Sequence, residues 1–255
     1  EAGSAVTELQ TSARIEGDMV VVNGTKVFST HSPDADLFLV YVRFGPGLDG
    51  IGSVLVDRGT PGLQVGPPSA FMSGEAWSQL FFDDCRIPVG NILLGEGGFR
   101  KQIAGFNVER LGNSARSLAL GQYCFEQARS YAMTRQQFGR PLCEFQGLQW
   151  KFADMKLKLE LAQLALYKAV LEGEGGLPTA QGTALAKLAC NQAGWDVANE
   201  ALQVMGALGY SQDTLVEYCV RRTRGWMIAG GSIEMLKNRI AEGVFGRSFP
   251  QRRSA

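Results

Sequence analysis

One segment, Arg135-Gln-Gln-Phe138-Gly139, combines a cation, an aromatic ring and a glycine just after a predicted helix. A guanidinium group can hold a phosphate with two parallel hydrogen bonds. The same pattern is typical of a helix that ends in a glycine C-cap beside a surface arginine. The pattern alone favours the structural interpretation and leaves phosphate binding open.

Two further segments place glycines beside polar residues at predicted helix ends. Gln203-Val-Met-Gly206-Ala207-Leu-Gly209-Tyr210 would let a backbone approach a flat or phosphorylated ligand, or would simply end a helix with an aromatic residue. In Ala229-Gly230-Gly231-Ser232-Ile-Glu234, Ser232 can cap the last predicted helix. The free N–H groups of such a helix start can also receive an anionic or carbonyl oxygen.

A carboxylate is the candidate acid–base group. Glu109 stands in a predicted helix, and Gly112 and Asn113 lie on the next turn. Glycine inside a helix costs about 1 kcal/mol relative to alanine, so Gly112 predicts that something packs closely there. A solvated Glu109 paired with Arg110 or Arg116 is the alternative.

Several classes of chemistry are disfavoured. The chain has one histidine, His31, and no GxSxG, P-loop or GxGxxG motif, which argues against a histidine metal site, serine hydrolases, phosphoryl transferases and Rossmann enzymes. We predict no metal. The five cysteines are scattered without metal spacing and are expected to be reduced thiols, mostly buried.

The first third of the chain predicts strands. Short apolar or alternating runs at 38–43, 51–57 and 77–82 are separated by Gly/Pro-rich turns. Asn23-Gly24 lies between the runs 19–22 and 26–30, and this dipeptide is typical of a tight hairpin turn. We therefore expect a small antiparallel sandwich or barrel.

After Gly95-Glu96-Gly97-Gly98 the apolar residues recur at helical spacing. The predicted helices cover about 99–134, 144–172, Pro178 to Met205, 214–224 and 232–245, with Pro178 in a first helical turn. Long helices joined by short loops predict an antiparallel bundle. The expected fold class is α+β, with a β domain at 1–95 and a helical bundle at 96–255.

Composition favours a small-molecule partner. The 255 residues can build a core without disulfides, 45% are hydrophobic, and 25 basic residues balance 25 acidic ones. This charge balance does not support a nucleic-acid surface. No apolar run approaches the roughly 18 residues of a membrane helix, so we predict no membrane span. The opening residue Glu1 suggests a fragment.

In order and spacing, six motifs resemble the acyl-CoA dehydrogenase family of flavoproteins, from Glu1 to about Phe249. The motifs are Glu1-Ala2-Gly3-Ser4, Asn23-Gly24-Thr-Lys26-Val-Phe28-Ser-Thr30, Ala35-Asp36-Leu37-Phe38, Arg135-x-x-Phe138-Gly139, Gln203-x-x-Gly206-x-x-Gly209-Tyr210 and Gly231-Ser232-x-Glu234. The resemblance implies the family's middle β domain and C-terminal bundle. Nothing in the chain corresponds to the family's N-terminal helical domain.

The resemblance implies FAD as cofactor. By position, Thr30 matches the residue that bonds the flavin edge near N5, Ser29 precedes it, and Phe28 replaces the usual tryptophan beside the ring. The residues matching those along the pyrophosphate path across a dimer interface are Arg135, Phe138, Gln146, Gln203, Gly206 and Ala207. Ser232 and Glu234 match residues that contact the adenosine part.

The resemblance also implies a base. Most members carry a catalytic glutamate where this chain has Gly230, but isovaleryl-CoA and long-chain acyl-CoA dehydrogenases supply one from the position of Glu109. In the family the amide of the residue at 230 donates to the thioester oxygen, so Gly230 keeps that backbone role. Residues at substrate-binding positions are Ser4, Asn107, Arg110 and Gly231.

The implied activity is α,β-dehydrogenation of an acyl-CoA in fatty acid metabolism, by a homotetramer built as a dimer of dimers with FAD at the subunit interface. An electron-transfer flavoprotein is the implied acceptor, and bacterial cytoplasm or mitochondrial matrix the implied location. The segment Met72–Trp77 replaces an arginine-containing stretch of many relatives. A relative with other chemistry, such as a desulfinase or oxidase, therefore stays open. A non-catalytic FAD-binding partner subunit of a heteromeric flavoprotein is the third alternative, and it would fit a missing N-terminal domain.

Overall fold

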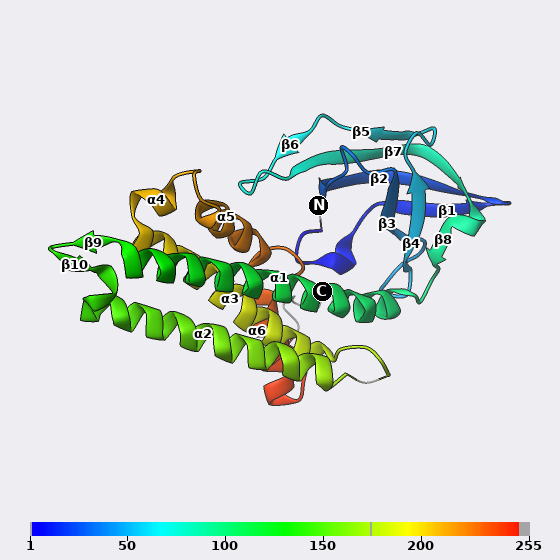
Figure 1. Ribbon diagram of the computed structural model, residues 1–255. Coiled ribbons are helices and arrows are strands. Elements are labelled where there is room, and N and C mark those ends of the chain that lie inside the picture. Colours follow the sequence, from blue (N-terminus) through cyan, green and yellow to red (C-terminus); the bar gives the residue numbers. More distant parts are fainter. Residues whose placement is uncertain (1, 174, 250–255) are drawn as a thin grey trace. The chain divides into compact units, whose positions relative to one another are not determined.

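A computed structural model describes residues 2–173 and 175–249, so Glu1 of the first motif and the end of the predicted bundle, 250–255, lie outside the described residues. The chain forms two compact units, and the division falls between Ile103 and Ala104 (Figure 1). Each unit is considered by itself below.

The first unit is one mixed sheet. Its strands are β1 (Ser12–Glu16), β2 (Met19–Thr30), β3 (Leu37–Arg43), β4 (Ile51–Asp57), β5 (Leu63–Val65), β6 (Ser69–Ala70), β7 (Ala76–Pro88) and β8 (Ile92–Leu94), with the 3-10 turns η1 (Val6–Glu8) and η2 (Val89–Asn91). The order is β5-β7-β2-β1-β3-β4-β8, with β6 on β7. All pairs are antiparallel except a parallel bridge between Ser12 of β1 and Arg43 of β3.

The core of this unit follows from alternation, because successive side chains of a strand point to opposite faces. In β3 the buried residues are Phe38, Val40 and Val42, and they pack in one cluster with Val54 and Val56 of β4. The exposed Leu37 and Leu39 lie on the other face of β3. The face of β3 that carries Phe38, Val40 and Val42 is therefore apolar and closed, whereas its other face stays accessible at Leu37 and Leu39.

The predicted hairpin turn at Asn23-Gly24 is wrong. β2 runs straight through both residues, and the tight turn lies earlier, where Glu16 pairs with Met19. Asn23 and Gly24 form an irregularity in the pairing with β7, where Asn23 exchanges hydrogen bonds of 3.0 and 2.9 Å with Asp84. A Cβ on Gly24 would lie 2.7 Å from Thr11 Cα, so the glycine serves a close approach of backbones rather than a turn.

The second unit is helical. It consists of most of α1 (Phe99–Thr134), the hairpin β9 (Gln136–Gln137) and β10 (Arg140–Pro141), η3 (Leu142–Glu144), α2 (Gln146–Leu171), α3 (Ala180–Met205), α4 (Ala207–Tyr210), α5 (Val216–Trp226) and α6 (Ile233–Phe245). Figure 1 shows α1, α2 and α3 extending side by side. The mixed sheet followed by a bundle confirms the predicted fold class.

Small residues bring α1 and α3 together. A Cβ on Gly194 of α3 would lie 2.4 Å from the Ser117 carbonyl oxygen of α1, and one on Gly121 would lie 3.0 Å from Gly194 Cα. Toward the helix ends the contact continues through buried alanines, Ala128 and Ala132 against Ala198 and Ala201. The backbones therefore touch almost directly, while larger α2 side chains such as Met155 and Leu159 fill the remaining space.

Two helix-end predictions need correction. α3 begins at Ala180 with Thr179 as N-cap, whose hydroxyl accepts from the Gly182 amide at 3.1 Å, so Pro178 precedes the cap and is not in the first turn. Gly139 is not a C-cap, since α1 already ends at Thr134 and Gly139 lies in the turn of the β9–β10 hairpin. The short helix α4 was not predicted.

The five cysteines are free thiols, as expected. Among residues 2–173 and 175–249, no helix is long and apolar enough to cross a membrane.

Gly24→Ala should lower the free energy of unfolding by about 1–3 kcal/mol, because the new methyl group overlaps Thr11 at a φ of +136°. Gly90→Ala in the same unit is the control, since its Cβ meets nothing within 4 Å. Urea denaturation of both variants checks this, and equal stabilities would contradict the close approach.

Candidate functional site

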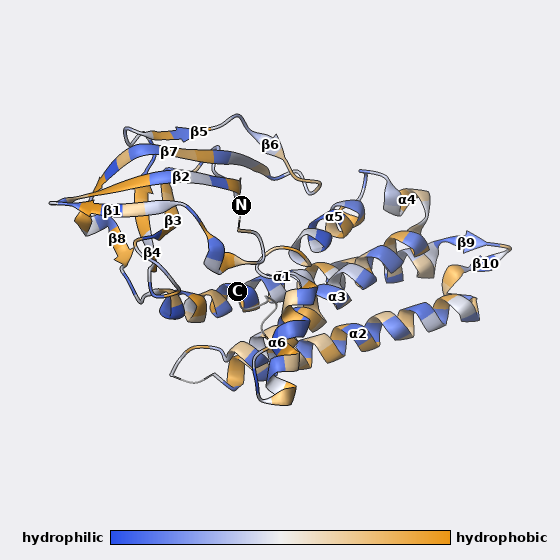
Figure 2. Ribbon diagram, turned by 180° about the vertical axis from the view of Figure 1, so that it is seen from behind, coloured by the Kyte–Doolittle hydropathy of each residue, from blue (hydrophilic) through white to orange (hydrophobic). Residues whose placement is uncertain are grey.

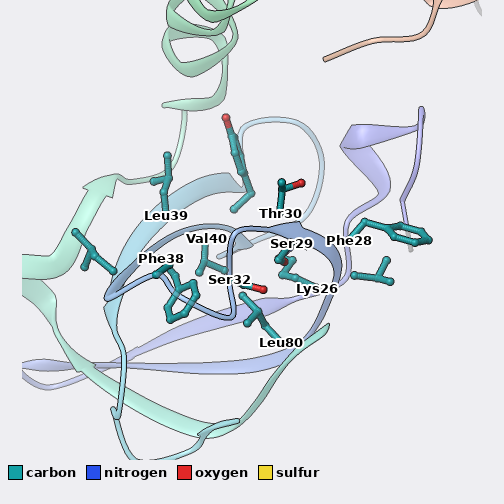
Figure 3. A pocket seen from close by; sticks show the side chains of 13 residues that line it. Lys26, Phe28, Ser29, Thr30, Ser32, Phe38, Leu39, Val40 and Leu80 are labelled. Carbon is teal, nitrogen blue, oxygen red and sulfur yellow. The ribbon is translucent and has the colours of Figure 1, made fainter. Parts of the chain in front are cut away.

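The first unit carries a hollow of about 370 Å³ over the ends of β2 and β3. Ser29 and Thr30 of β2 and Leu39 and Val40 of β3 line it, and Figure 3 shows their side chains around its rim. Ser32, in the turn after β2, is bound to β7, because the Ser78 amide donates to its hydroxyl oxygen at 3.0 Å. The hollow is partly polar and partly apolar, which suits a flat heteroaromatic ligand.

Phe28, beside this hollow, has an uncommon backbone conformation. Its φ is +54°, a left-handed conformation that costs a residue with a Cβ roughly 1–2 kcal/mol. Its ring is 60% exposed and touches Trp77 at 4.6 Å between centroids. A strained, exposed aromatic residue favours a binding role over a structural one.

A second group of expected residues gathers at one end of the bundle. Phe138 and Gly139 form the two-residue turn of the β9–β10 hairpin, with φ values of +52° and +79°. Such turns favour Asn and Gly, so a phenylalanine there is unfavourable, and its ring is 93% exposed. Within the described chain, the side chains of Arg135, Gln146 and Gln203 are exposed and form no hydrogen bonds.

The glycines of the α3–α4 junction have separate roles. Gly206 ends α3 at a φ of +59°, and its amide donates to the Leu202 carbonyl at 3.0 Å. Ala207 follows it and is exposed. A Cβ on Gly209 would lie 2.8 Å from the Leu202 oxygen, so this glycine lets α4 fold back on α3. The end of α3 and the return of α4 onto it are therefore enough to explain Gly206 and Gly209 within the chain itself.

Glu109 projects from α1 into the open. Its side chain is exposed, and its hydrogen-bond partner among the described residues is the Asn113 amide at 3.4 Å. A Cβ on Gly112 would meet nothing within 4 Å, so the close packing predicted there is not found within the described chain. A carboxylate beside an open glycine leaves space for a ligand.

The next residue, Arg110, connects α1 to the loop before α6. Its Nε donates to the Gly230 carbonyl at 2.8 Å and its Nη1 to Asn107 Oδ1 at 3.0 Å. Asn107 is buried and donates to the Pro178 carbonyl at 3.3 Å. The substrate-position residues Asn107, Arg110 and Gly231 are thus in one cluster, whereas Ser4 lies in an exposed turn of the first unit.

The Gly230–Ser232 loop leaves its own amides unpaired. Gly230 and Gly231 have φ values of +70° and +102°, conformations that glycine adopts readily. In the described part of the chain, the amides of Gly230, Gly231 and Ser232 have no hydrogen-bond partner. Ser232 is the predicted N-cap of α6, accepting from the Met235 amide at 3.4 Å.

Glu234 lies in the first turn of α6. Its own amide and the Ser232 hydroxyl hold the pKa of its carboxyl below the usual value, and Lys237 and Arg224 act in the same direction. Glu234 is therefore ionised at neutral pH, and its side chain is exposed at the start of α6.

Sequence reasoning missed Lys187. This residue of α3 is fully buried, and its Nζ donates to the Trp226 carbonyl at 3.0 Å and the Gly231 carbonyl at 3.2 Å. Burial lowers the pKa of Lys187 to about 8, and the positive charge of Arg110 adds to this, while Glu109 opposes it. A lysine among alanines on a helix gives no sequence signal of burial.

Family models match both units: "Acyl-CoA dehydrogenase, middle domain" over residues 1–85 and "Acyl-CoA dehydrogenase, C-terminal domain" over residues 96–245. The chain belongs to the acyl-CoA dehydrogenase family. This confirms the resemblance on which the flavoprotein assignment rests.

Relatives within this family differ in their named activities. The chain is 36% identical to a 3-sulfinopropanoyl-CoA desulfinase of Paraburkholderia xenovorans, over 100% of this chain and 68% of that one. It is 34% identical to a short-chain specific acyl-CoA dehydrogenase of Clostridium acetobutylicum, over 96% and 66%. The chain thus spans about two thirds of these acyl-CoA dehydrogenase relatives.

A solved structure agrees with the fold. The butyryl-CoA dehydrogenase of Megasphaera elsdenii superimposes with a TM-score of 0.89 at 30% identity, covering 96% of this chain and 66% of that one. Membership of the acyl-CoA dehydrogenase family therefore rests on both sequence and fold.

The lowered pKa of Lys187 predicts a pH dependence of stability. Between pH about 8 and 10.5 the unfolded chain binds a proton at Lys187 that the folded chain has lost, so this residue makes the free energy of unfolding rise with pH in that window. Lys187→Met should lack this rise. The free energy of unfolding of the native protein minus that of the variant should rise by up to about 1.4 kcal/mol per pH unit in urea denaturation at a series of pH values. A constant difference would contradict the lowered pKa of Lys187.

Proposed function

We propose that the chain is the FAD-binding and base-bearing part of an enzyme that removes two hydrogens from the α and β carbons of an acyl-CoA. The observation that carries this proposal is Glu109, an exposed carboxylate on the rigid helix α1, next to the open position Gly112. The negative charge of Glu109 raises the pKa of Lys187, so the two side chains are close enough to interact electrostatically. Lys187 in turn donates a hydrogen bond to the Gly231 carbonyl, which connects the surroundings of Glu109 to the Gly230–Ser232 loop.

These groups fit the needs of thioester dehydrogenation. The α C–H of a thioester is a weak acid, so a carboxylate must take the proton while the carbonyl oxygen is stabilised as it gains charge. Glu109 would take the proton. The unpaired amides of the Gly230–Ser232 loop, Gly230 first, would donate to the oxygen.

The residues present also fit FAD. Thr30 and Ser29 line a hollow for a flat ring, with Phe28 strained and exposed beside it. Phe138 presents an exposed ring at the bundle end, where the Arg135 guanidinium has no partner in the described chain and could bind a pyrophosphate. Gln146, Gln203, Gly206 and Ala207 would complete this path, and Ser232 and Glu234 would meet the adenosine part. When bound, FAD would accept the hydride from the β carbon.

A second copy of the chain is the proposed neighbour. α2 buries one apolar face, yet a second apolar stripe remains exposed, and Figure 2 shows hydrophobic residues recurring along this helix. The stripe consists of side chains that are each more than half exposed, namely Trp150, Leu157, Leu161, Leu164, Tyr167 and Leu171. Such a patch is typical of an interface, which supports a homo-oligomer with FAD at a subunit boundary. An electron-transfer flavoprotein stays the proposed acceptor, in bacterial cytoplasm or mitochondrial matrix.

A desulfinase is the second candidate, because relatives at 34–36% identity are named 3-sulfinopropanoyl-CoA desulfinase. Breaking the C–S bond at the β carbon of such a thioester does not require a base for an α proton. Glu109 therefore favours dehydrogenation over desulfination, and over a partner subunit without catalysis.

Glu109→Gln should abolish reduction of bound FAD by acyl-CoA, by at least about 10³-fold, because an amide cannot accept the α proton. The measurement is anaerobic bleaching of the flavin absorption band with a panel of short, branched and long acyl-CoAs. Glu126→Gln is the control, since Glu126 lies further along α1 and pairs with Arg129 at 2.9 Å. Unchanged bleaching in Glu109→Gln would refute the base, and sulfite release from 3-sulfinopropanoyl-CoA without bleaching would favour the desulfinase.

Phe138→Asn should have opposite effects on stability and on FAD binding. Asparagine suits the positive φ of the turn, so the FAD-free protein should gain up to about 1 kcal/mol of stability. Loss of the ring should weaken FAD binding about tenfold. Thermal unfolding and flavin fluorescence titration measure the two effects, and unchanged FAD affinity would remove Phe138 from the site.

A further inference from the structure

We propose that Lys187 is a positioning residue: with Arg110 it clamps the Gly230–Ser232 loop and so holds the loop amides in the arrangement that receives the thioester oxygen. This inference rests on the proposed function and adds a residue from α3 to it. Lys187 lies outside the motifs that carry the family resemblance.

The two cations bind successive carbonyls of the loop. Arg110 Nε donates to the Gly230 oxygen at 2.8 Å, and Lys187 Nζ donates to the Gly231 oxygen at 3.2 Å. Lys187 also donates to the Trp226 oxygen at 3.0 Å, where the Asn191 amide donates at 2.7 Å. The segment from Trp226, the last residue of α5, to Gly231 is thus attached to α3 at both of its ends, and to α1 at Gly230.

Peptide geometry converts these bonds into orientation of donors. In a trans peptide the C=O and the following N–H point in opposite directions. Because the Gly230 and Gly231 carbonyls face Arg110 and Lys187, the amides of Gly231 and Ser232 must point away from the two cations. These amides, like that of Gly230, have no partner in the described chain, so the clamp leaves all three available to a ligand oxygen.

The close fit of the lysine stem is part of the clamp. A Cβ on Gly230 would lie 3.4 Å from Lys187 Cε and 3.9 Å from Arg110 Cγ. The loop backbone therefore rests on both aliphatic stems, and its positive φ values are held from one side. The Lys187 ammonium loses its hydration on burial and lies beside the positive charge of Arg110. Two backbone carbonyls and the charge of Glu109 compensate this loss only in part, so Lys187 lowers the free energy of unfolding. Such a cost is expected where a residue serves a site.

The test compares Lys187→Met with Thr183→Val in the FAD-loaded, full-length natural protein. Met keeps the stem and loses the donors, whereas Thr183 is buried one turn earlier on α3 with a hydroxyl that has no partner in the described chain. For Lys187→Met we expect kcat to fall about 10- to 100-fold with KM within about threefold. Thr183→Val should change neither.

Hydrogen exchange supplies a readout that does not need turnover. Ile228 and Ile233 donate to Gly225 and Met227 around the loop, so their amides report its order. We expect Lys187→Met to speed exchange in peptides covering 227–233 about tenfold, with Thr183→Val unchanged. Unaltered kcat, or equal effects of both variants, would overturn the proposal.

Two further measurements cover the cases in which Lys187→Met does not fold or the native protein shows no activity. If Lys187→Met does not fold, Lys187→Gln and Lys187→Arg replace it: Arg, a longer donor, should restore kcat more fully than Gln, and the reverse order would overturn the clamp. If the native protein shows no flavin reduction with any acyl-CoA, the proposed function fails. Hydrogen exchange at 227–233 then still decides whether Lys187 orders the loop.

Discussion

The contact of α1 with α3 through Gly121 and Gly194 determines how the rest of the bundle is arranged. Because neither glycine has a Cβ, the helices approach until Ser117 backbone atoms nearly touch Gly194. This distance and register allow Arg110, from α1, and Lys187, from α3, to reach consecutive carbonyls of one loop. A bulkier side chain at either glycine would separate the helices and with them the two cations.

Features that cost stability concentrate at the candidate ligand positions. Phe28 and Phe138 have positive φ values and exposed side chains, whereas the buried residues of the strands close an apolar core. The buried Lys187 belongs to the same group. A chain selected only for stability would replace each of them, so their presence is an argument for binding that does not depend on sequence similarity.

Local pattern predicted the helices well and the tertiary contacts poorly. The recurrence of apolar residues at helical spacing located α1 at Phe99–Thr134, because a run of this length without proline has few alternatives. Asn23-Gly24 was misinterpreted since the partners that decide its conformation, Thr11 and Asp84, are remote in sequence. Lys187 was missed for the same reason: its acceptors Trp226 and Gly231 lie 39 and 44 residues away. Motifs selected Glu109 and Phe138, but only coordinates show their exposure.

Glycine at position 230 bears both on where the proposed base stands and on how the loop packs against Lys187 and Arg110. A side chain at 230 would begin 3.4 Å from the Lys187 stem, at a φ of +70° that favours glycine, so the loop is suited to contribute backbone donors alone. The carboxylate must then come from another element, and Glu109 on α1 precedes the very residue, Arg110, that holds the Gly230 carbonyl. In the proposed function, the base and the loop that offers the oxygen donors would thus be held by neighbouring residues of one helix, while Gly230, Gly231 and Ser232 themselves carry no titratable side chain.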